Sequence, residues 1–199
     1  MSNSFLEFLR PHKTVPKTPW SAASRWDLNP ARIGVLFFGL FIFGLGDSLL
    51  IQSTIGNAPW SVLAQGVSGK LDITMGWSTF AISSLVLLLW IPLKEKPGFG
   101  TLSNIVIIAT AIQIGVSIFP EQNTYGFGVI YCLIGIGMVG LGSALYITCA
   151  LGPGPRDGWM TSLHRRTGIP VGRVRTAIEV SVLLAGWALG GRIGLGTAL

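Results

Sequence analysis

Five uninterrupted apolar stretches restrict what this chain can fold into. Each is close to the ~20 residues that a helix needs to cross a hydrocarbon layer of about 30 Å. They run over residues 33–53, 75–93, 102–119, 127–150 and 174–189. Their apolar character is continuous and does not alternate at every second residue, which indicates helices and not the strands of a barrel. We therefore predict an all-α fold, a polytopic transmembrane helical bundle.

The composition is that of a membrane protein. Half of the 199 residues are hydrophobic and only 11% are charged, whereas about a quarter of the residues of a soluble domain are charged. The net charge of +6 does not indicate a nucleic-acid partner, because the basic residues are spread over the segments between the apolar stretches. We expect the lipid bilayer and anionic lipid headgroups as partners, together with a small solute if the protein transports one. The glycine-rich helix faces are compatible with an oligomer.

Residues 1–31 form a basic arm that we expect in the cytosol. The arm lacks the apolar core and the small-residue cleavage site of a signal peptide. Basic residues favour the cytosolic side of a membrane. Those of the arm include Arg10, Lys13, Lys17 and Arg25.

The chain contains an internal repeat, which a shift of 96 positions against itself reveals without a gap. Chance similarity between apolar helices would not align glycines and prolines, so we predict two copies of one helical unit. The identical pairs include Gly44 with Gly140, Gly46 with Gly142, Gly56 with Gly152, Pro59 with Pro155, Gly98 with Gly194, Gly100 with Gly196 and Thr101 with Thr197.

We assign repeat one to residues 32–124 and repeat two to residues 125–199. Repeat one is predicted to contain helices at about 33–53, 74–93 and 101–119, and repeat two helices at about 126–150 and 171–190. Each also contains a short segment, at 59–70 and 155–166, that is too short to span and is expected to be re-entrant or interfacial. A counterpart of helix 101–119 is absent from repeat two, so either the chain is a truncated product or five crossings suffice.

The distribution of basic residues favours three crossings per repeat. With the arm inside, this count also places Lys94, Lys96 and the arginines between 156 and 173 inside, and the Glu121 loop outside. An odd number of crossings turns the second copy upside down relative to the first. We therefore predict inverted repeats, the arrangement of many secondary transporters.

Two acidic residues lie within the apolar stretches. A carboxylate in lipid is costly, so Asp47 is a candidate ion or proton site. Glu179 has two interpretations: a second such site, or the partner of Arg175 one turn earlier.

The turns that precede the two short segments are the second group of candidates. Each interrupts an apolar helix with glycine and proline, and a helix that begins at membrane depth offers its amides to an anion. An ordinary loop at headgroup level is the alternative interpretation. The candidate substrate-binding or ion-binding residues in these turns are Asn57, Pro59, Gly152, Gly154, Pro155, Arg156 and Asp157.

A basic cluster follows the second turn and comprises His164 with Arg156, Arg165, Arg166, Arg173 and Arg175. Anionic lipid headgroups are its simplest partners; an anionic substrate or a cytosolic protein is the alternative.

The sequence from Gly135 to Gly140 matches a dinucleotide fingerprint but lies inside an apolar helix with no preceding strand. Because no catalytic motif and no spaced set of metal ligands is present, we expect neither an enzyme nor a metal or cofactor.

The segments GNAPW, LGPGPRDGWM, RTAIEV and GWALGGRIGLGT resemble the YczE/YyaS/YitT family of bacterial membrane proteins, in particular its YczE-like branch. The resemblance covers about residues 30–199. It implies a multi-pass protein of the bacterial plasma (inner) membrane without an established activity, with a cytosolic N-terminus, and members usually continue into a further helix after the GxGT turn. The motif residues it carries over are Gly152, Pro153, Gly154, Pro155, Arg156, Asp157, Gly158, Arg175 and Glu179.

The leading functional hypothesis is a secondary transporter or exporter of a small solute. Inverted units, broken helices and Asp47 motivate this hypothesis. The alternative is a non-transporting membrane scaffold or regulatory protein, whose basic cytosolic loop binds a partner or anionic lipid.

Overall fold

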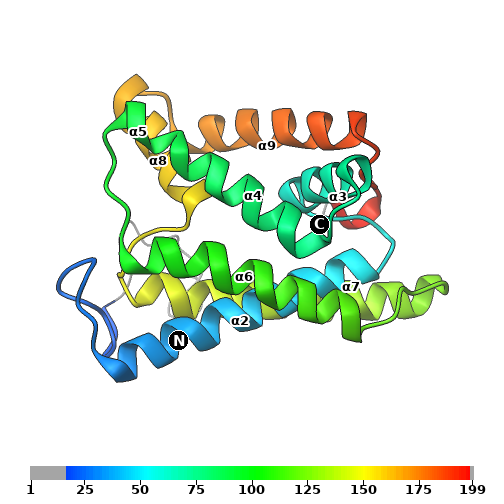
Figure 1. The fold of residues 1–199 in the computed structure, drawn as a ribbon, viewed down its shortest axis with the longest axis horizontal. Helices are drawn as coiled ribbons and strands as arrows, with labels where there is room; N and C mark the ends of the chain where they lie inside the picture. Colours follow the sequence, from blue (N-terminus) through cyan, green and yellow to red (C-terminus); the bar gives the residue numbers. More distant parts are fainter. Residues whose placement is uncertain (1–16, 198–199) are drawn as a thin grey trace, which may run out of the picture.

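The computed structural model describes residues 17–197, so residues 1–16 of the predicted cytosolic arm lie outside it. The described chain forms α-helices with no strand. In chain order they are α2 (Pro30–Gln52), α3 (Pro59–Leu71), α4 (Met75–Leu88), α5 (Trp90–Leu93), α6 (Phe99–Ile118), α7 (Tyr125–Thr148), α8 (Pro155–Thr167) and α9 (Val171–Ala188), followed by a 3-10 turn η1 (Leu195–Thr197). In Figure 1, α2, α6 and α7 form the lower part of the molecule, and α3, α4, α8 and α9 form the upper part.

Four helical segments are long and apolar enough to cross a membrane: α2, the α4–α5 stretch Met75–Leu93, α6 and α7. The prediction of a helical membrane protein is thereby confirmed. The fifth predicted span falls on α9, which contains Arg173, Arg175 and Glu179 and is not among these four. The crossing of the membrane by α9 remains a prediction.

Local chemistry sets where the helices begin and end. Helix α2 starts at Pro30, three residues before the predicted start, because the Asn29 side chain accepts a hydrogen bond from the Ala31 amide and proline suits a first turn. Helix α4 stops at Leu88, and Leu89 alone separates it from the short helix α5, which contains Pro92. Proline has no amide hydrogen to donate to the preceding turn, which accounts for the interruption of the predicted 74–93 helix.

Glycines allow the long helices to approach closely. A Cβ atom built on Gly46 of α2 would lie 2.8 Å from the carbonyl oxygen of Gly135 in α7, and one on Gly44 would lie 2.6 Å from the Ala111 Cβ of α6. Any larger residue at these positions would push the helices apart. Close packing of α2 against both α6 and α7 makes it the most buried of the four candidate spans.

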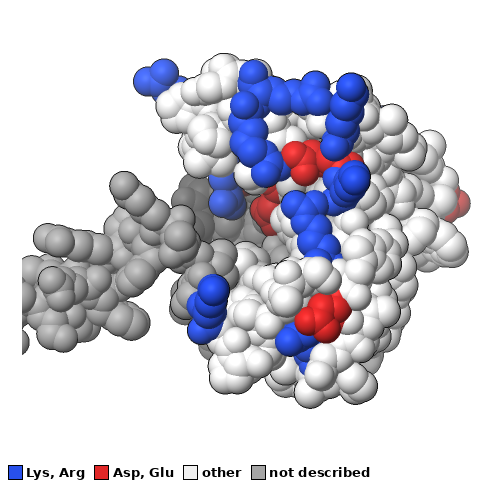
Figure 2. All heavy atoms as spheres, turned by 90° about the vertical axis from the view of Figure 1, so that its left-hand side faces the viewer, with Lys and Arg blue, Asp and Glu red and all other residues white. Residues whose placement is uncertain are grey.

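The two ends of the bundle carry different polar contacts. At one end Arg165 forms an ion pair with Glu95, and Arg25 donates a hydrogen bond to the Lys96 carbonyl. At the other end the Thr54 hydroxyl donates to the Gln122 carbonyl at 2.7 Å, and Arg192 lies 3.9 Å from Glu121. Figure 2 shows Lys and Arg side chains gathered on the first of these ends, the left-hand side of Figure 1.

Candidate functional site

A cavity of about 630 Å³ lies between the long helices and the starts of α3 and α8. Both glycine-proline turns reach it, through Ala58, Pro59, Gly154 and Pro155. Its apolar lining residues are Phe43, Leu50, Ile108, Ile136, Val139, Ile147 and Met160. Its polar and aromatic lining residues are Trp60, Ser83, Asn104, Ser143, Tyr146, Arg156, Asp157, Arg175, Glu179 and Thr197.

The two short helices present uncapped N-termini to this cavity. Pro59 and Pro155 are the first residues of α3 and α8, and neither preceding residue, Ala58 nor Gly154, provides a side-chain cap. The first-turn amides of Trp60, Arg156 and Asp157 have no acceptor within residues 17–197. Such amides, together with the positive end of the helix dipole, favour an anionic partner.

Arg156 and Trp60 meet at the cavity. The Arg156 Cζ atom lies 4.8 Å from the centroid of the Trp60 ring, a cation–π contact. The side chain has no ion pair or side-chain hydrogen bond in the described part of the chain. Burial lowers the pKa of Arg156, while the nearby carboxylates of Asp47 and Asp157 act in the opposite direction. An arginine nevertheless remains a cation at neutral pH.

One residue further on, each short helix is tied to the long helix that precedes it. The Ser61 hydroxyl of α3 donates to both carboxylate oxygens of Asp47 in α2, at 2.8 and 3.0 Å. The Tyr146 hydroxyl of α7 donates to Asp157 of α8 at 2.7 Å. Ser61 and Asp157 occupy equivalent positions under the shift of 96. The same place in each short helix therefore fixes its start against the preceding helix.

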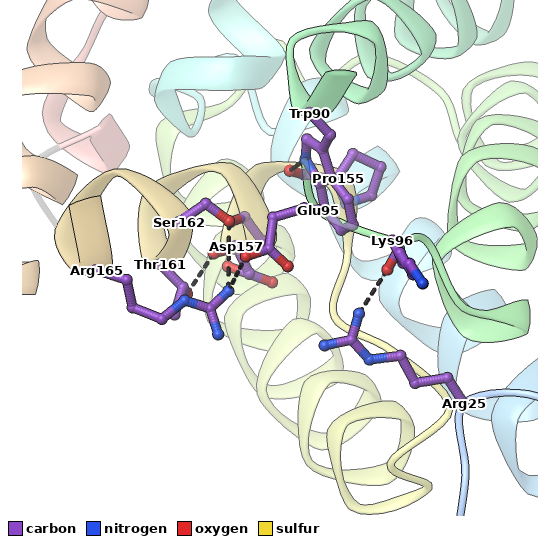
Figure 3. Close-up of polar contacts among 10 residues, drawn as sticks. Arg25, Trp90, Glu95, Lys96, Pro155, Asp157, Thr161, Ser162 and Arg165 are labelled. Carbon is purple, nitrogen blue, oxygen red and sulfur yellow. Dashed lines mark hydrogen bonds and ion pairs between the residues drawn. The ribbon is translucent and has the colours of Figure 1, made fainter. Parts of the chain in front are cut away.

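Residues of α5 and α6 hold the start of α8. The Trp90 indole nitrogen donates to the Pro155 carbonyl at 2.9 Å, as Figure 3 shows, and Trp90 is 2% exposed. The Thr101 hydroxyl donates to the Pro153 carbonyl at 2.8 Å. A Cβ atom on Gly158 would lie 2.0 Å from Trp90, so glycine is required for the indole to fit beside α8.

Equivalent positions also exchange hydrogen bonds across the molecule. The Gly100 amide donates to the Leu151 carbonyl at 2.9 Å, and the Gly196 amide donates to the Ile55 carbonyl at the same distance. Gly196 and Leu151 lie 96 positions after Gly100 and Ile55, respectively. Each turn before a short helix is thus bound by the other half of the chain.

Residues 30–199 match a family described as a family of unknown function, DUF6198. The chain belongs to this family. The expected likeness to YczE-like proteins is confirmed, because the uncharacterized membrane protein YczE of Bacillus subtilis is 33% identical over 165 residues, 82% of this chain and 77% of its own length. The uncharacterized protein YyaS of the same organism is 29% identical over 167 residues, 81% of this chain and 82% of its own length.

A further relative of this DUF6198 protein occurs in Haemophilus influenzae. That uncharacterized protein is 44% identical over 187 residues, 94% of this chain and 86% of the relative. No solved structure matches the chain.

Most of the predicted site residues line the cavity, and three lie outside its lining. Those that line it are Pro59, Gly154, Pro155, Arg156, Asp157, Arg175 and Glu179, and the last two form an ion pair of 2.8 Å. The other three lie elsewhere. Asp47 is 4% exposed beneath Ser61, Asn57 donates to Gln65 at 3.2 Å, and Gly152 borders a second hollow with Pro153 and Asp157.

The residues predicted for the site did not include Ser61 or Tyr146, and Trp60 entered only as the last residue of the GNAPW turn. Trp60 and Ser61 are the counterparts of Arg156 and Asp157 in repeat one. Comparing the two turns position by position would have singled out both. No pattern in the sequence indicates that Tyr146 contacts Asp157.

Proposed function

We propose that this membrane protein is a secondary transporter or exporter of a small solute, with the cavity as its binding chamber. The observation that carries the proposal is the meeting of the α3 and α8 starts at one cavity, with Trp60 against Arg156. Secondary transporters commonly bind their solute where the broken helices of two repeats come together. A volume of about 630 Å³ falls within the ordinary range for small-molecule sites, roughly 300–1,000 Å³.

The proposal includes two inverted repeats with short re-entrant helices. The exchanged hydrogen bonds of Gly100 and Gly196 support a two-fold relationship between the halves. The contact between Glu95 and Arg165 supports three crossings per repeat, since the segment after α5 and the last turn of α8 meet at the same end of the bundle. In this arrangement α9 crosses as the counterpart of α4.

Asp47 is the proposed coupling site. Its carboxylate is buried beneath Ser61, outside the cavity lining, and receives only the Ser61 hydroxyl as a side-chain hydrogen-bond donor within residues 17–197. An ionisable residue within a membrane span is costly and marks an ion or proton pathway, so a proton or a cation is the partner proposed for this carboxylate. Ser61 connects the binding of that partner to the start of α3, and through Trp60 to Arg156.

Two-sided access to the cavity tests the transport proposal without knowledge of the solute. Ser143 lines the cavity, and Ser143→Cys can be made in a background that carries Cys132→Ala and Cys149→Ala, which removes both native, buried thiols. In oriented vesicles, a membrane-impermeant maleimide should label position 143 from either side, because a transporter alternates between two openings. Labelling from one side only, or from neither, would reject transport.

A membrane scaffold is the second candidate function. It is favoured by the exposed Arg165 and Arg166 in the last turn of α8, which suit an acidic partner or anionic lipid. Capture of a partner that is lost in the Arg165→Gln/Arg166→Gln double variant, together with one-sided labelling at position 143, would favour the scaffold over the transporter.

A further inference from the structure

The charged groups at the cavity differ in how they are partnered. Glu179 has Arg175 at 2.8 Å and Asp157 has the Tyr146 hydroxyl at 2.7 Å. Arg156 reaches the same cavity with the Trp60 ring as its close partner and no carboxylate in ion-pair contact among residues 17–197. Arg156 is therefore a cation at the cavity without an ion-pair partner among residues 17–197, and the nearby Asp157 carboxylate keeps its charge because its partner is an uncharged hydroxyl.

The backbone around Arg156 adds to this preference. Arg156 is the second residue of α8, and Trp60 is the second residue of α3. The amides of these two residues lack acceptors in the described chain, and neither N-terminus is capped by a side chain. Two positive helix ends and a guanidinium therefore meet at the Trp60–Arg156 contact, which favours an anionic group at that place in the cavity.

The remainder of the cavity wall is apolar. Residues Leu50, Ile108, Ile136 and Val139 contribute to it from three different long helices. A bare inorganic anion would leave this surface without contacts. A ligand that fits both parts carries its charge at one end and an apolar body at the other.

We propose, on the basis of the proposed function, that the solute is an organic anion: one carboxylate or phosphate group on an apolar body. Its anionic end binds the Arg156 guanidinium and the free first-turn amides of α3 and α8. Its body lies against the apolar wall. A free amphiphilic anion and an anionic phospholipid share this chemistry.

Calorimetric titration of the full chain in phosphatidylcholine nanodiscs tests the inference, with octanoate as the probe. Octylammonium, of equal chain length and opposite charge, and inorganic phosphate, which has no apolar body, are the comparison ligands. Octanoate should bind most tightly. Its affinity should fall about tenfold or more in Arg156→Gln, because a charge-assisted hydrogen bond is lost. The exposed Arg166→Gln variant should bind octanoate as the unaltered chain does.

Arg156→Lys is the control for a loss of binding caused by misfolding of Arg156→Gln. It keeps the charge but loses the bidentate geometry, so its affinity should lie between those of the other two proteins. Octanoate that fails to bind the unaltered chain, or that binds Arg156→Gln and Arg156→Lys equally well, would overturn the inference. So would octylammonium binding as tightly as octanoate.

Changing the lipid composition of the nanodiscs distinguishes a free amphiphilic anion from an anionic phospholipid. If phosphatidylglycerol in the nanodiscs weakens octanoate binding to the unaltered chain, an anionic lipid occupies the site. If octanoate binding is unchanged, the site binds a free solute.

The anion assignment and the transport proposal can be rejected independently of each other. Two-sided labelling at position 143 without octanoate binding removes only the anion assignment, and octanoate binding with one-sided labelling removes only transport.

Discussion

The Arg156 guanidinium lies over the Trp60 indole, 4.8 Å from the ring centroid. The two residues occupy equivalent positions, each second in its short helix and 96 residues apart. Their contact places the starts of α3 and α8 together at the cavity. The two halves of the chain therefore meet at the site through corresponding residues.

The Trp60–Arg156 contact should appear as an energetic coupling. In a double-mutant cycle with Trp60→Leu and Arg156→Met, we expect a coupling of about 0.5–2 kcal/mol in the free energy of unfolding in detergent, the range of cation–π contacts. The cycle of Trp60→Leu with Arg166→Met is the matched control and should show no coupling, because Arg166 is exposed outside the cavity lining. Equal coupling in both cycles would contradict the contact.

Equivalent glycines should respond differently to alanine. In Gly44→Ala the new Cβ would meet the Ala111 Cβ at 2.6 Å, so we expect a loss of about 1–3 kcal/mol in stability from overpacking. The counterpart Gly140 has nothing within 4 Å, so Gly140→Ala should be neutral or stabilising by up to about 1 kcal/mol. Unfolding in detergent measures both, and similar losses at the two sites would contradict the packing of α2 on α6.

Thr101 should stabilise the turn before α8. Thr101→Val keeps the shape of the side chain but leaves the Pro153 carbonyl without its donor, so we expect a loss of about 1–3 kcal/mol in thermal stability measurements. Thr101→Ser should restore most of it. Thr110→Val, on the same helix, is the control: Thr110 is exposed and its hydroxyl donates to the Val106 carbonyl of its own helix, so its replacement should change stability little.

The sidedness of four positions tests the proposed topology. Single cysteines at positions 95 and 165 should react with an impermeant reagent from the same side of oriented vesicles, because Glu95 and Arg165 form an ion pair. Cysteines at positions 121 and 192 should react from the other side, since Glu121 and Arg192 lie near each other at the opposite end. Opposite sidedness for positions 95 and 165 would refute three crossings per repeat.

Removal of the Asp47 charge should bias the proposed conformational equilibrium. Asp47→Asn keeps one acceptor oxygen for the Ser61 hydroxyl, removes the charge and replaces the other carboxylate oxygen by an NH2 donor. We expect the ratio of labelling of Ser143→Cys from the two sides to shift by roughly tenfold, the effect of about 1.4 kcal/mol. Ser48→Ala, which removes a buried hydroxyl that donates to its own helix, should leave the ratio unchanged. An unaltered ratio in Asp47→Asn would remove the coupling role of this residue.

The sequence by itself determined the local features of this protein. Continuous apolar stretches specified membrane helices, because the hydrocarbon layer requires every peptide group to bond within its own helix. Glycine and proline marked the starts of α3 and α8, since backbone angles and the missing proline amide act within a few residues. For α9 the same reasoning produced a fifth span, although Arg173, Arg175 and Glu179 set this helix apart from the four clear candidates.

Only the tertiary structure decided which of these features form one site. It buried Asp47 beneath Ser61 instead of in the cavity wall, paired Tyr146 with Asp157, and brought Trp60 to Arg156. Each of these contacts depends on how helices distant in the chain pack, which in turn depends on close approaches such as that of Gly46 to Gly135. Packing of this kind is a property of two surfaces at once, so no local pattern in either segment encodes it.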